Sequence, residues 1–297
     1  MAALQFPFFK PAEELPASLP TVSDILTSED IIKGTETWAT RKVVGVGEHF
    51  IAKYGKSNDA IEGKNLLFLE QNGFQNIVPK LYAMWKETDG TLFLVMERLR
   101  GDTLDKLWPT LQEADKDRIL KNTADIFTQI RAVPHEEFFG SVDKCHMPHH
   151  LFWCPDLPQN ISGPFTNERA AIQGLLAKSR KTAQLNRKHA YFADTFEEQL
   201  MAGLVVDNGK APVFTHSDLQ RKNILVEITD DDKHGKDFRV SLVDWESAGW
   251  YPVWWEYFAA FIALQWQDDW CRKVVKVVDA WPAEAALMKM VYHDLWL

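Results

Sequence analysis

Polar side chains that could do chemistry gather in FTHSDLQRKNILV, residues 214–226, between two apolar runs. Asp218 and Asn223 lie five positions apart in this stretch, and His216 comes just before them. So many polar groups cannot all be buried without partners, because an unpaired buried polar group is costly. The stretch is therefore expected to be a loop at the edge of a buried element, with side chains available for binding or catalysis.

A further carboxylate follows in VSLVDWESAGW, residues 240–250, where a strand-like run ends at Asp244. The intervening segment indicates a hairpin, whose pairing would bring Asn223 close to Asp244. Such oxygen ligands suit Mg²⁺, which needs few protein ligands when phosphates supply the rest. A separate carboxylate, here Asp218, can orient or deprotonate an acceptor hydroxyl. Protein kinases transfer phosphoryl groups with this arrangement of Asp, Asn and a later Asp.

Phosphoryl transfer also requires a cation for the nucleotide phosphates. HFIAKYG, residues 49–55, places Lys53 on the second strand of a predicted hairpin, and Glu62 follows nine positions later in the first turn of a predicted helix. An ion pair between the two would hold the lysine head against the phosphates. In VMERLRGDTL, the backbone from Glu97 to Leu99 could hydrogen-bond an adenine.

The elements that must position these residues follow from turn signals and apolar spacing. Residues 35–97 indicate β-β-α-β-β, with the second hairpin turning at Asp89-Gly90. Before them, Ser23–Lys33 is typical of a short helix whose first residue is the N-cap. The rest of the chain has mainly helical spacing. Helices are expected over 113–132, 167–182, 188–204, 255–270 and 272–296.

Together these motifs resemble the aminoglycoside phosphotransferase and choline kinase-like family, in a form common in fungal genomes. THSDLQRKNILV and LVDWESAGWYPVWWEY carry the resemblance. Earlier in the chain, the first lobe contains IAKYG, IEGKNLLFLEQN and VMERLRGDTL in the order that the family has. It covers roughly residues 35–270 and implies an α+β, protein-kinase-like fold of two lobes. Residues 1–97 would form an N-terminal extension and a small β-rich nucleotide-binding lobe with one helix. Residues 98–297 would form a larger, mainly helical lobe with the catalytic loop and the acceptor site.

The resemblance also implies roles for the residues of the loop. The family transfers the γ-phosphate of ATP to a small molecule. By position, Asp218 would be the catalytic base and His216 would brace its loop, while Asn223 and Asp244 would hold Mg²⁺. Ser217 departs from the family, which often has Gly at this position.

The same resemblance implies a nucleotide site in the first lobe. Lys53 would hold the ATP phosphates and Glu62 would anchor Lys53, beside an adenine held by the backbone of Glu97 and Leu99. Residues 33–42 contain one glycine and lack the glycine-rich pattern that covers the phosphates in protein kinases.

Plainer alternatives exist for several residues. Asp218 could be a turn residue that caps its own backbone, Lys53 could be a solvated strand lysine, and the helix dipole alone favours Glu62 in a first turn. CHMPHHLFWC, residues 145–154, contains zinc-ligand residue types but matches no zinc spacing, so a loop or pocket wall is favoured over a structural metal. A later aromatic group is expected to be mostly core: Trp250, Tyr251, Trp254, Trp255 and Tyr257.

The composition favours a soluble, cytoplasmic protein. Of the 297 residues, 46% are hydrophobic and 25% are charged, and no apolar run is long enough for a membrane span. The net charge of −9 argues against nucleic acid or an anionic membrane as partner. Three cysteines make no disulfide framework. The expected partner is a small-molecule acceptor, and monomer and dimer both stay open.

The sequence therefore predicts an ATP- and Mg²⁺-dependent phosphotransferase that acts on a hydroxyl, or an amine, of a small molecule. One alternative is a non-catalytic kinase-fold protein that binds a nucleotide or metabolite. The other is a kinase-fold enzyme with different chemistry, such as nucleotidyl transfer. The presence of the whole residue set argues against the non-catalytic alternative.

Overall fold

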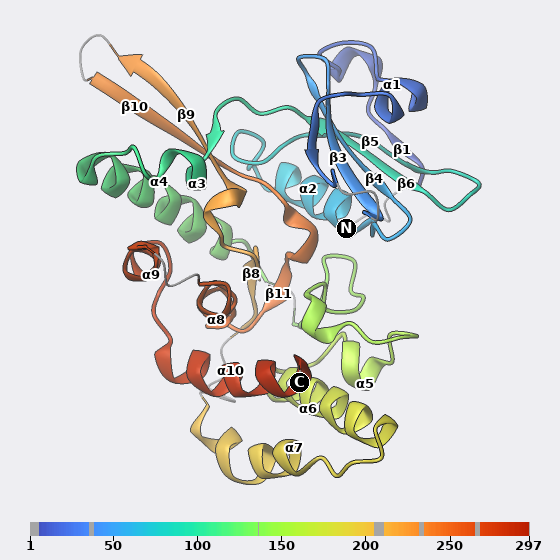
Figure 1. Ribbon diagram of the computed structural model, residues 1–297, viewed down its shortest axis with the longest axis vertical. Helices are drawn as coiled ribbons and strands as arrows, with labels where there is room; N and C mark the ends of the chain where they lie inside the picture. The colour runs from blue at the N-terminus through green and yellow to red at the C-terminus, as the bar shows by residue number, and fades with distance from the viewer. Residues whose placement is uncertain are drawn as a thin grey trace. The chain divides into compact units, whose positions relative to one another are not determined.

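The computed structural model describes residues 6–35, 39–135, 137–204, 211–231, 235–264 and 268–296. The chain divides into two compact units, which are coloured by residue number in Figure 1. Unit 1 consists of Met1–Thr103 and Ile224–Glu246, and unit 2 consists of Leu104–Asn223 and Ser247–Leu297. Within the described ranges, each helix is too short or too polar to cross a membrane.

An antiparallel sheet of six strands forms the body of unit 1, in the order β1-β5-β6-β4-β3-β2. The order β-β-α-β-β predicted over residues 35–97 is confirmed as β3 to β6 with helix α2, and the sheet has β1 and β2 in addition. The bounds are β1 (Phe8–Phe9), β2 (Ile31–Lys33), β3 (Arg41–Val46), β4 (Phe50–Gly55), α2 (Ile61–Gln71), β5 (Leu81–Lys86) and β6 (Leu92–Glu97).

Helix α2 packs closely against this sheet (Figure 1). A Cβ atom on Gly63 would lie 2.6 Å from the sulfur of Met84 on β5, which is closer than any real contact. Leu66 and Leu69 of the same helix are buried. The close approach holds the first turn of α2, where Glu62 lies, firmly on the sheet.

The helix predicted over Ser23–Lys33 is wrong in its second half. Helix α1 covers only Val22–Leu26, and its N-cap is Thr21. The Thr21 hydroxyl accepts a hydrogen bond from the Asp24 N–H, and the Asp24 carboxylate accepts one from the Thr21 N–H at 2.8 Å. Residues Ile31–Lys33 instead pair with β3 as strand β2. Adjacent β-branched residues favour a strand once a partner strand is available.

A long hairpin belongs to unit 1 although it comes late in the chain. Strands β9 (Ile224–Asp231) and β10 (Gly235–Leu242) are antiparallel, so that the first residue of β9 faces the last residue of β10. Strand β7 (Asp102–Thr103) pairs with β9 to complete a small sheet. The predicted hairpin is present, and its tip, residues 232–234, lies outside the described residues.

Unit 2 is mainly helical, and the helices predicted over 113–132 and 167–182 are confirmed as α4 and α6 (Figure 1). A two-stranded sheet of β8 and β11 lies among the helices. The bounds are α3 (Leu104–Leu107), α4 (Glu113–Arg131), α5 (Gln159–Ser162), α6 (Glu168–Leu185), α7 (Tyr191–Thr195), β8 (Val213–Thr215), β11 (Gly249–Tyr251), α8 (Trp255–Ile262), α9 (Trp270–Lys273) and α10 (Pro282–Trp296).

Three of the predicted helices are interrupted. Over 188–204, α7 is followed by one π turn and one 3₁₀ turn. Over 255–270, α8 ends at Ile262, and 272–296 is divided between the end of α9, a 3₁₀ turn and α10. Pro282 is the first residue of α10, a position where its missing N–H is not needed. Apolar spacing continues across such breaks and therefore does not reveal them.

The aromatic group predicted to be core is confirmed as core. Trp250, Tyr251, Trp254 and Trp255 are each at most 1% exposed. Tyr257 packs against the same cluster as a partly buried side chain. We refer to these five side chains of unit 2 as the aromatic floor.

Candidate active site

Asp218 lies in unit 2, in the loop between β8 and a 3₁₀ turn over Arg221–Asn223. Asn223 Nδ2 donates to Asp218 Oδ2 at 2.7 Å and to the Asp218 carbonyl at 3.0 Å. Gln220 Nε2 donates to the other carboxylate oxygen. The structure therefore brings Asp218 and Asn223 together, and two amides fix the carboxylate while leaving it lone pairs for a further donor.

Asn223 is buried, and its amide nitrogen is used by Asp218. Its Oδ1 atom is buried and has no hydrogen-bond partner in the described part of the chain. A buried acceptor in this state is costly unless a ligand takes it. Amide oxygens are among the ligands that hard divalent cations take. The geometry of Asn223 therefore fits a metal ligand.

His216 and Ser217 shape the backbone beside Asp218. His216 Nδ1 accepts the N–H of Asp218 at 3.2 Å. Ser217 has a φ of 69°, in the left-handed region that favours glycine. The Ser217 hydroxyl accepts a hydrogen bond from Trp255 Nε1 at 2.8 Å, so it ties the strained residue to the aromatic floor.

Glu256 on α8 holds this loop, and sequence reasoning did not identify it. Its Oε2 atom accepts the N–H of His216 at 2.8 Å and the N–H of Ser217 at 3.1 Å. Burial raises the pKa of Glu256, although His216 and the two N–H groups oppose this shift. The available signal was a carboxylate inside the apolar run WWEYF, because a fully buried Glu needs partners.

We expect Glu256→Ala to lower the free energy of unfolding by about 3 kcal/mol, because two buried N–H groups lose their acceptor. Urea denaturation followed by fluorescence of the nearby tryptophans measures this change. Glu256→Gln is the matched control, since its amide oxygen can still accept, and it should lose less than half as much. Equal stability of Glu256→Ala and the natural chain would show that the loop does not depend on this carboxylate.

Lys53 lies in unit 1, on β4, between two carboxylates. Its Nζ atom is 2.6 Å from Glu62 Oε1 and 2.7 Å from Asp244 Oδ1. The side chains are nearly buried, at 14% exposed for Lys53 and 5% for Glu62, so Lys53 is not a solvated strand lysine. Burial alone would lower the pKa of Lys53, but Glu62 and Asp244 outweigh it and raise this pKa above its ordinary value. Lys53 is therefore charged at neutral pH.

Asp244 follows β10 and has a φ of 70°, a strained backbone for a residue other than glycine. Its second carboxylate oxygen, Oδ2, is 2.8 Å from Lys33 Nζ. Burial alone would raise the pKa of Asp244, but Lys53 and Lys33 hold this pKa well below its ordinary value. Asp244 is thus ionised, and each of its carboxylate oxygens is paired with a lysine.

Two further side chains complete this cluster: Glu246, which the sequence offers either as support for the metal shell or as a salt-bridge partner, and Arg41, which the sequence does not indicate. Arg41 Nη1 lies 2.8 Å from Glu246 Oε2. Within the described ranges, the carboxylates with the spacing of a metal site are Glu62, Asp244 and Glu246, whose oxygens lie within 4.8 Å of one another. The cationic partners of these carboxylates are Lys33, Arg41 and Lys53. Strand pairing brings these three residues together, so the sequence does not reveal them as a group.

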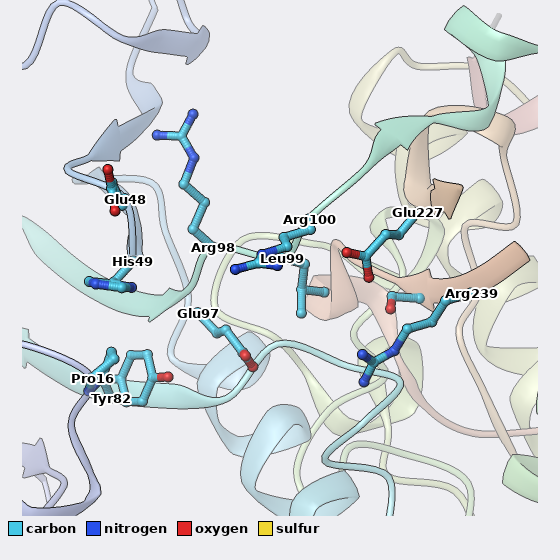
Figure 2. Close-up of a pocket in the computed structure, with 11 residues that line it drawn as sticks. Pro16, Glu48, His49, Tyr82, Glu97, Arg98, Leu99, Arg100, Glu227 and Arg239 are labelled. Carbon is cyan, nitrogen blue, oxygen red and sulfur yellow. The ribbon is translucent and has the colours of Figure 1, made fainter. Parts of the chain in front are cut away.

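A cavity of about 530 Å³ lies in unit 1 beside the segment that follows β6. Figure 2 shows Glu48 and His49 on one side of it and Glu227 and Arg239 on the other, with the 98–100 segment between them. The lining residues are Pro16, Glu48, His49, Tyr82, Glu97, Arg98, Leu99, Arg100, Glu227, Arg239 and Ser241. The two residues predicted to face an adenine, Glu97 and Leu99, therefore both line this cavity.

The backbone N–H groups of residues 97–99, which line this cavity, differ in whether they have an acceptor. The N–H of Glu97 donates to the Lys80 carbonyl at 2.9 Å, and the N–H of Arg98 donates to the His49 carbonyl at 2.8 Å. For the N–H of Leu99, the structure shows no acceptor among the residues it describes. Leu99 therefore offers a backbone donor to a ligand in the cavity.

The His- and Cys-containing segment 145–154 belongs to the framework of unit 2. The N–H of His149 donates to the Tyr251 hydroxyl at 2.9 Å, and His149 Nδ1 accepts the N–H of Leu151 at 3.3 Å. Burial, together with His150 and Lys178, holds the pKa of His149 well below its ordinary value. His149 is therefore a neutral core residue that supports the aromatic floor.

Comparison with solved structures shows the fold. The streptomycin–ATP ternary complex of APH(2″)-IIa has a TM-score of 0.58 at 14% identity over 89% of this chain and 84% of that chain. ADP-bound aminoglycoside phosphotransferase APH(2″)-Ib has a TM-score of 0.59 at 12% identity over 90% and 84%. A thermostable mutant of aminoglycoside phosphotransferase APH(4)-Ia, with ADP and hygromycin B, has a TM-score of 0.57 at 15% identity over 92% and 86%. The predicted α+β, kinase-like fold is confirmed.

No curated protein matches this chain. The profile of the phosphotransferase enzyme family matches residues 60–286, which include Glu62, the loop around Asp218, and Asp244. This match covers about three quarters of the chain and confirms the family that the sequence motifs resemble. The chain belongs to the phosphotransferase enzyme family.

Proposed function

We propose that this protein transfers the γ-phosphate of ATP, together with Mg²⁺, to a hydroxyl of a small molecule. The observation that carries the proposal is the position of Lys53 between Glu62 and Asp244. Kinases depend on a lysine that a glutamate fixes beside a metal-binding aspartate. Membership of the phosphotransferase family supports the reaction class.

The nucleotide would bind to unit 1. Lys53 would contact the phosphates, since Glu62 holds its ammonium group in place. The adenine would enter the cavity beside Leu99, whose N–H is available as a donor, and Glu97 would contribute its carbonyl. Donors that are already in place lower the cost of ordering on binding.

Asn223 and Asp244 would hold Mg²⁺. The support is chemical: Asn223 has a buried oxygen without a partner, and Asp244 is an ionised carboxylate. Asn223 also directly precedes β9. Strand β10, which pairs with β9, ends two residues before Asp244. When bound, Mg²⁺ supplies positive charge to the phosphate oxygens.

Asp218 would accept the proton of the acceptor hydroxyl. Gln220 and Asn223 hold its two oxygens, so the carboxylate is aimed before a substrate arrives. Loose phosphoryl-transfer transition states gain most from such positioning. His216 would contribute indirectly, through its hydrogen bond to the Asp218 N–H.

The acceptor would be a small molecule with several hydroxyl groups. Two of the similar structures hold streptomycin or hygromycin B together with a nucleotide. The net charge of −9 on this chain is compatible with a cationic acceptor. We expect the protein to act in the cytoplasm, because no disulfide joins its three cysteines and ATP is available there.

Incubating the protein with a metabolite extract, ATP and Mg²⁺, followed by mass spectrometry, tests this function. We expect one or more compounds to gain the mass of a phosphate group, and the gain to disappear without Mg²⁺. A gain of a nucleotide mass would instead indicate nucleotidyl transfer. If nothing gains mass in several extracts although ATP binds, the protein is a binding module and the proposed reaction is wrong.

A further inference from the structure

Lys33 and Arg41 lie at the two ends of the segment that joins β2 to β3. Lys33 is the last residue of β2 and Arg41 is the first residue of β3, and the two strands pair antiparallel. Both side chains are about half exposed, at 49% and 50%. This is the segment in which the sequence lacks a glycine-rich phosphate loop.

Each of these cations holds one carboxylate of the cluster. Lys33 Nζ lies 2.8 Å from Asp244 Oδ2, and Arg41 Nη1 lies 2.8 Å from Glu246 Oε2. The other oxygen of Asp244 is taken by Lys53. A cation that binds Asp244 would therefore compete with Lys33, whose exposed side chain moves more easily than that of the nearly buried Lys53.

The charges make this exchange favourable. Lys33, Arg41 and Lys53 balance the carboxylates of Glu62, Asp244 and Glu246. A divalent cation at Asp244 would bring the positive charge that the carboxylates lose when Lys33 leaves. Phosphate groups would bring the negative charge that the released ammonium and guanidinium groups need, and arginine in particular recognises phosphate through several donors.

We propose that Lys33 and Arg41 bind the nucleotide phosphates, and that without nucleotide they occupy the carboxylates of Asp244 and Glu246. The two side chains thereby replace the backbone donors of a glycine-rich loop. They also keep the metal-binding carboxylate closed until metal and phosphates arrive together. This inference rests on the proposed ATP-dependent function.

The test is whether one substitution changes two affinities in opposite directions. In the full-length protein, Lys33→Ala should tighten the binding of Mn²⁺ without nucleotide by about fivefold, because a competing cation is removed. The same variant should weaken binding of ATP with Mg²⁺ by about tenfold, because a phosphate contact is lost. Electron paramagnetic resonance of free Mn²⁺ measures the first affinity, and calorimetric titration measures the second.

Three comparisons make the result specific. Adenosine, which has no phosphates, should bind the natural chain and Lys33→Ala equally. Arg41→Ala should weaken ATP binding with a smaller effect on Mn²⁺, since Glu246 is 44% exposed. Lys42→Ala removes the same charge from the neighbouring position, whose side chain lies on the opposite face of β3, and should change neither affinity.

Several outcomes would overturn the inference. If Lys33→Ala binds Mn²⁺ and ATP like the natural chain, Lys33 is a surface ion pair only. If Lys33→Ala weakens both affinities, Lys33 supports the structure of the site and does not compete with the metal. If Lys42→Ala has the same effect as Lys33→Ala, general electrostatics explain the change. If the natural chain itself binds no nucleotide, the proposed function fails, and the phosphate role of Lys33 fails with it.

Discussion

Replacing Asp218 with asparagine is expected to lower the rate of phosphoryl transfer by about a hundredfold or more, the scale for a positioned base. The substitution keeps the shape of the side chain but removes the group that receives the proton. It also turns one acceptor oxygen into an amide nitrogen that faces the donor of either Gln220 or Asn223, which loosens the aim of the side chain. Steady-state kinetics on an acceptor found by mass gain measures the change.

Nucleotide titration of the same variant shows whether Asp218 acts as a catalytic base or as a metal ligand. Affinity for ATP with Mg²⁺ should change little, because Lys53 and Asp244 bind the nucleotide in this scheme. Lys222→Ala tests the neighbouring charge separately, since its Nζ atom forms a long ion pair with Asp218 Oδ2 at 3.8 Å. Normal turnover of Asp218→Asn would make Asp218 a bystander, and a complete loss of nucleotide binding would make it a metal ligand.

Replacing Lys53 with alanine is expected to reduce stability as well as nucleotide use. The nearly buried Glu62 would lose its ammonium partner and face Asp244 as a second negative charge. Breaking a buried ion pair on one side costs about 3–5 kcal/mol, because the remaining charge is uncompensated. Urea denaturation at pH 7 should show a loss of this size, and ATP turnover should fall with it.

A second substitution distinguishes repulsion from lost packing. Glu62→Gln removes the uncompensated charge, so the double variant Lys53→Ala with Glu62→Gln should regain a large part of the lost stability. The deficit of the single variant should also shrink as the pH falls towards the ordinary pKa of a carboxyl, because a protonated Glu62 carries no charge. A deficit that stays the same in the double variant and at low pH would show that the aliphatic chain of Lys53, and not its charge, matters.

The fold of unit 1 could be predicted where the signals are local. The turn at Asp89-Gly90 is set by those two residues: Gly90 has a φ of 90°, and the Asp89 carboxylate accepts the N–H of Thr91 at 2.9 Å. Runs of strand-forming residues on either side of the two predicted hairpin turns indicated β3, β4, β5 and β6 in their order along the sequence. The N-terminal strands were harder, because Ile31–Lys33 becomes a strand only through pairing with β3.

The candidate site shows the same division between local and distant causes. Asp218 and Asn223 are close in sequence, so their contact could be expected from the loop itself. Lys33, Arg41 and Glu256 contact residues that are far away in the sequence and carry no motif of their own. Their partners are decided by strand pairing and helix packing, which composition and spacing do not encode.

The late position of the β9–β10 hairpin has a consequence for protein synthesis. The first 103 residues leave the ribosome long before β9, the strand to which β7 pairs. Until then Lys53 lacks its second carboxylate partner, and the buried amide of Asn65 lacks the carbonyl of Trp245, to which it donates at 2.8 Å. A nascent or truncated chain that ends before residue 224 should therefore be recognised by chaperones and proteases as incomplete. An isolated nucleotide-binding fragment would need residues 224–246 linked to it.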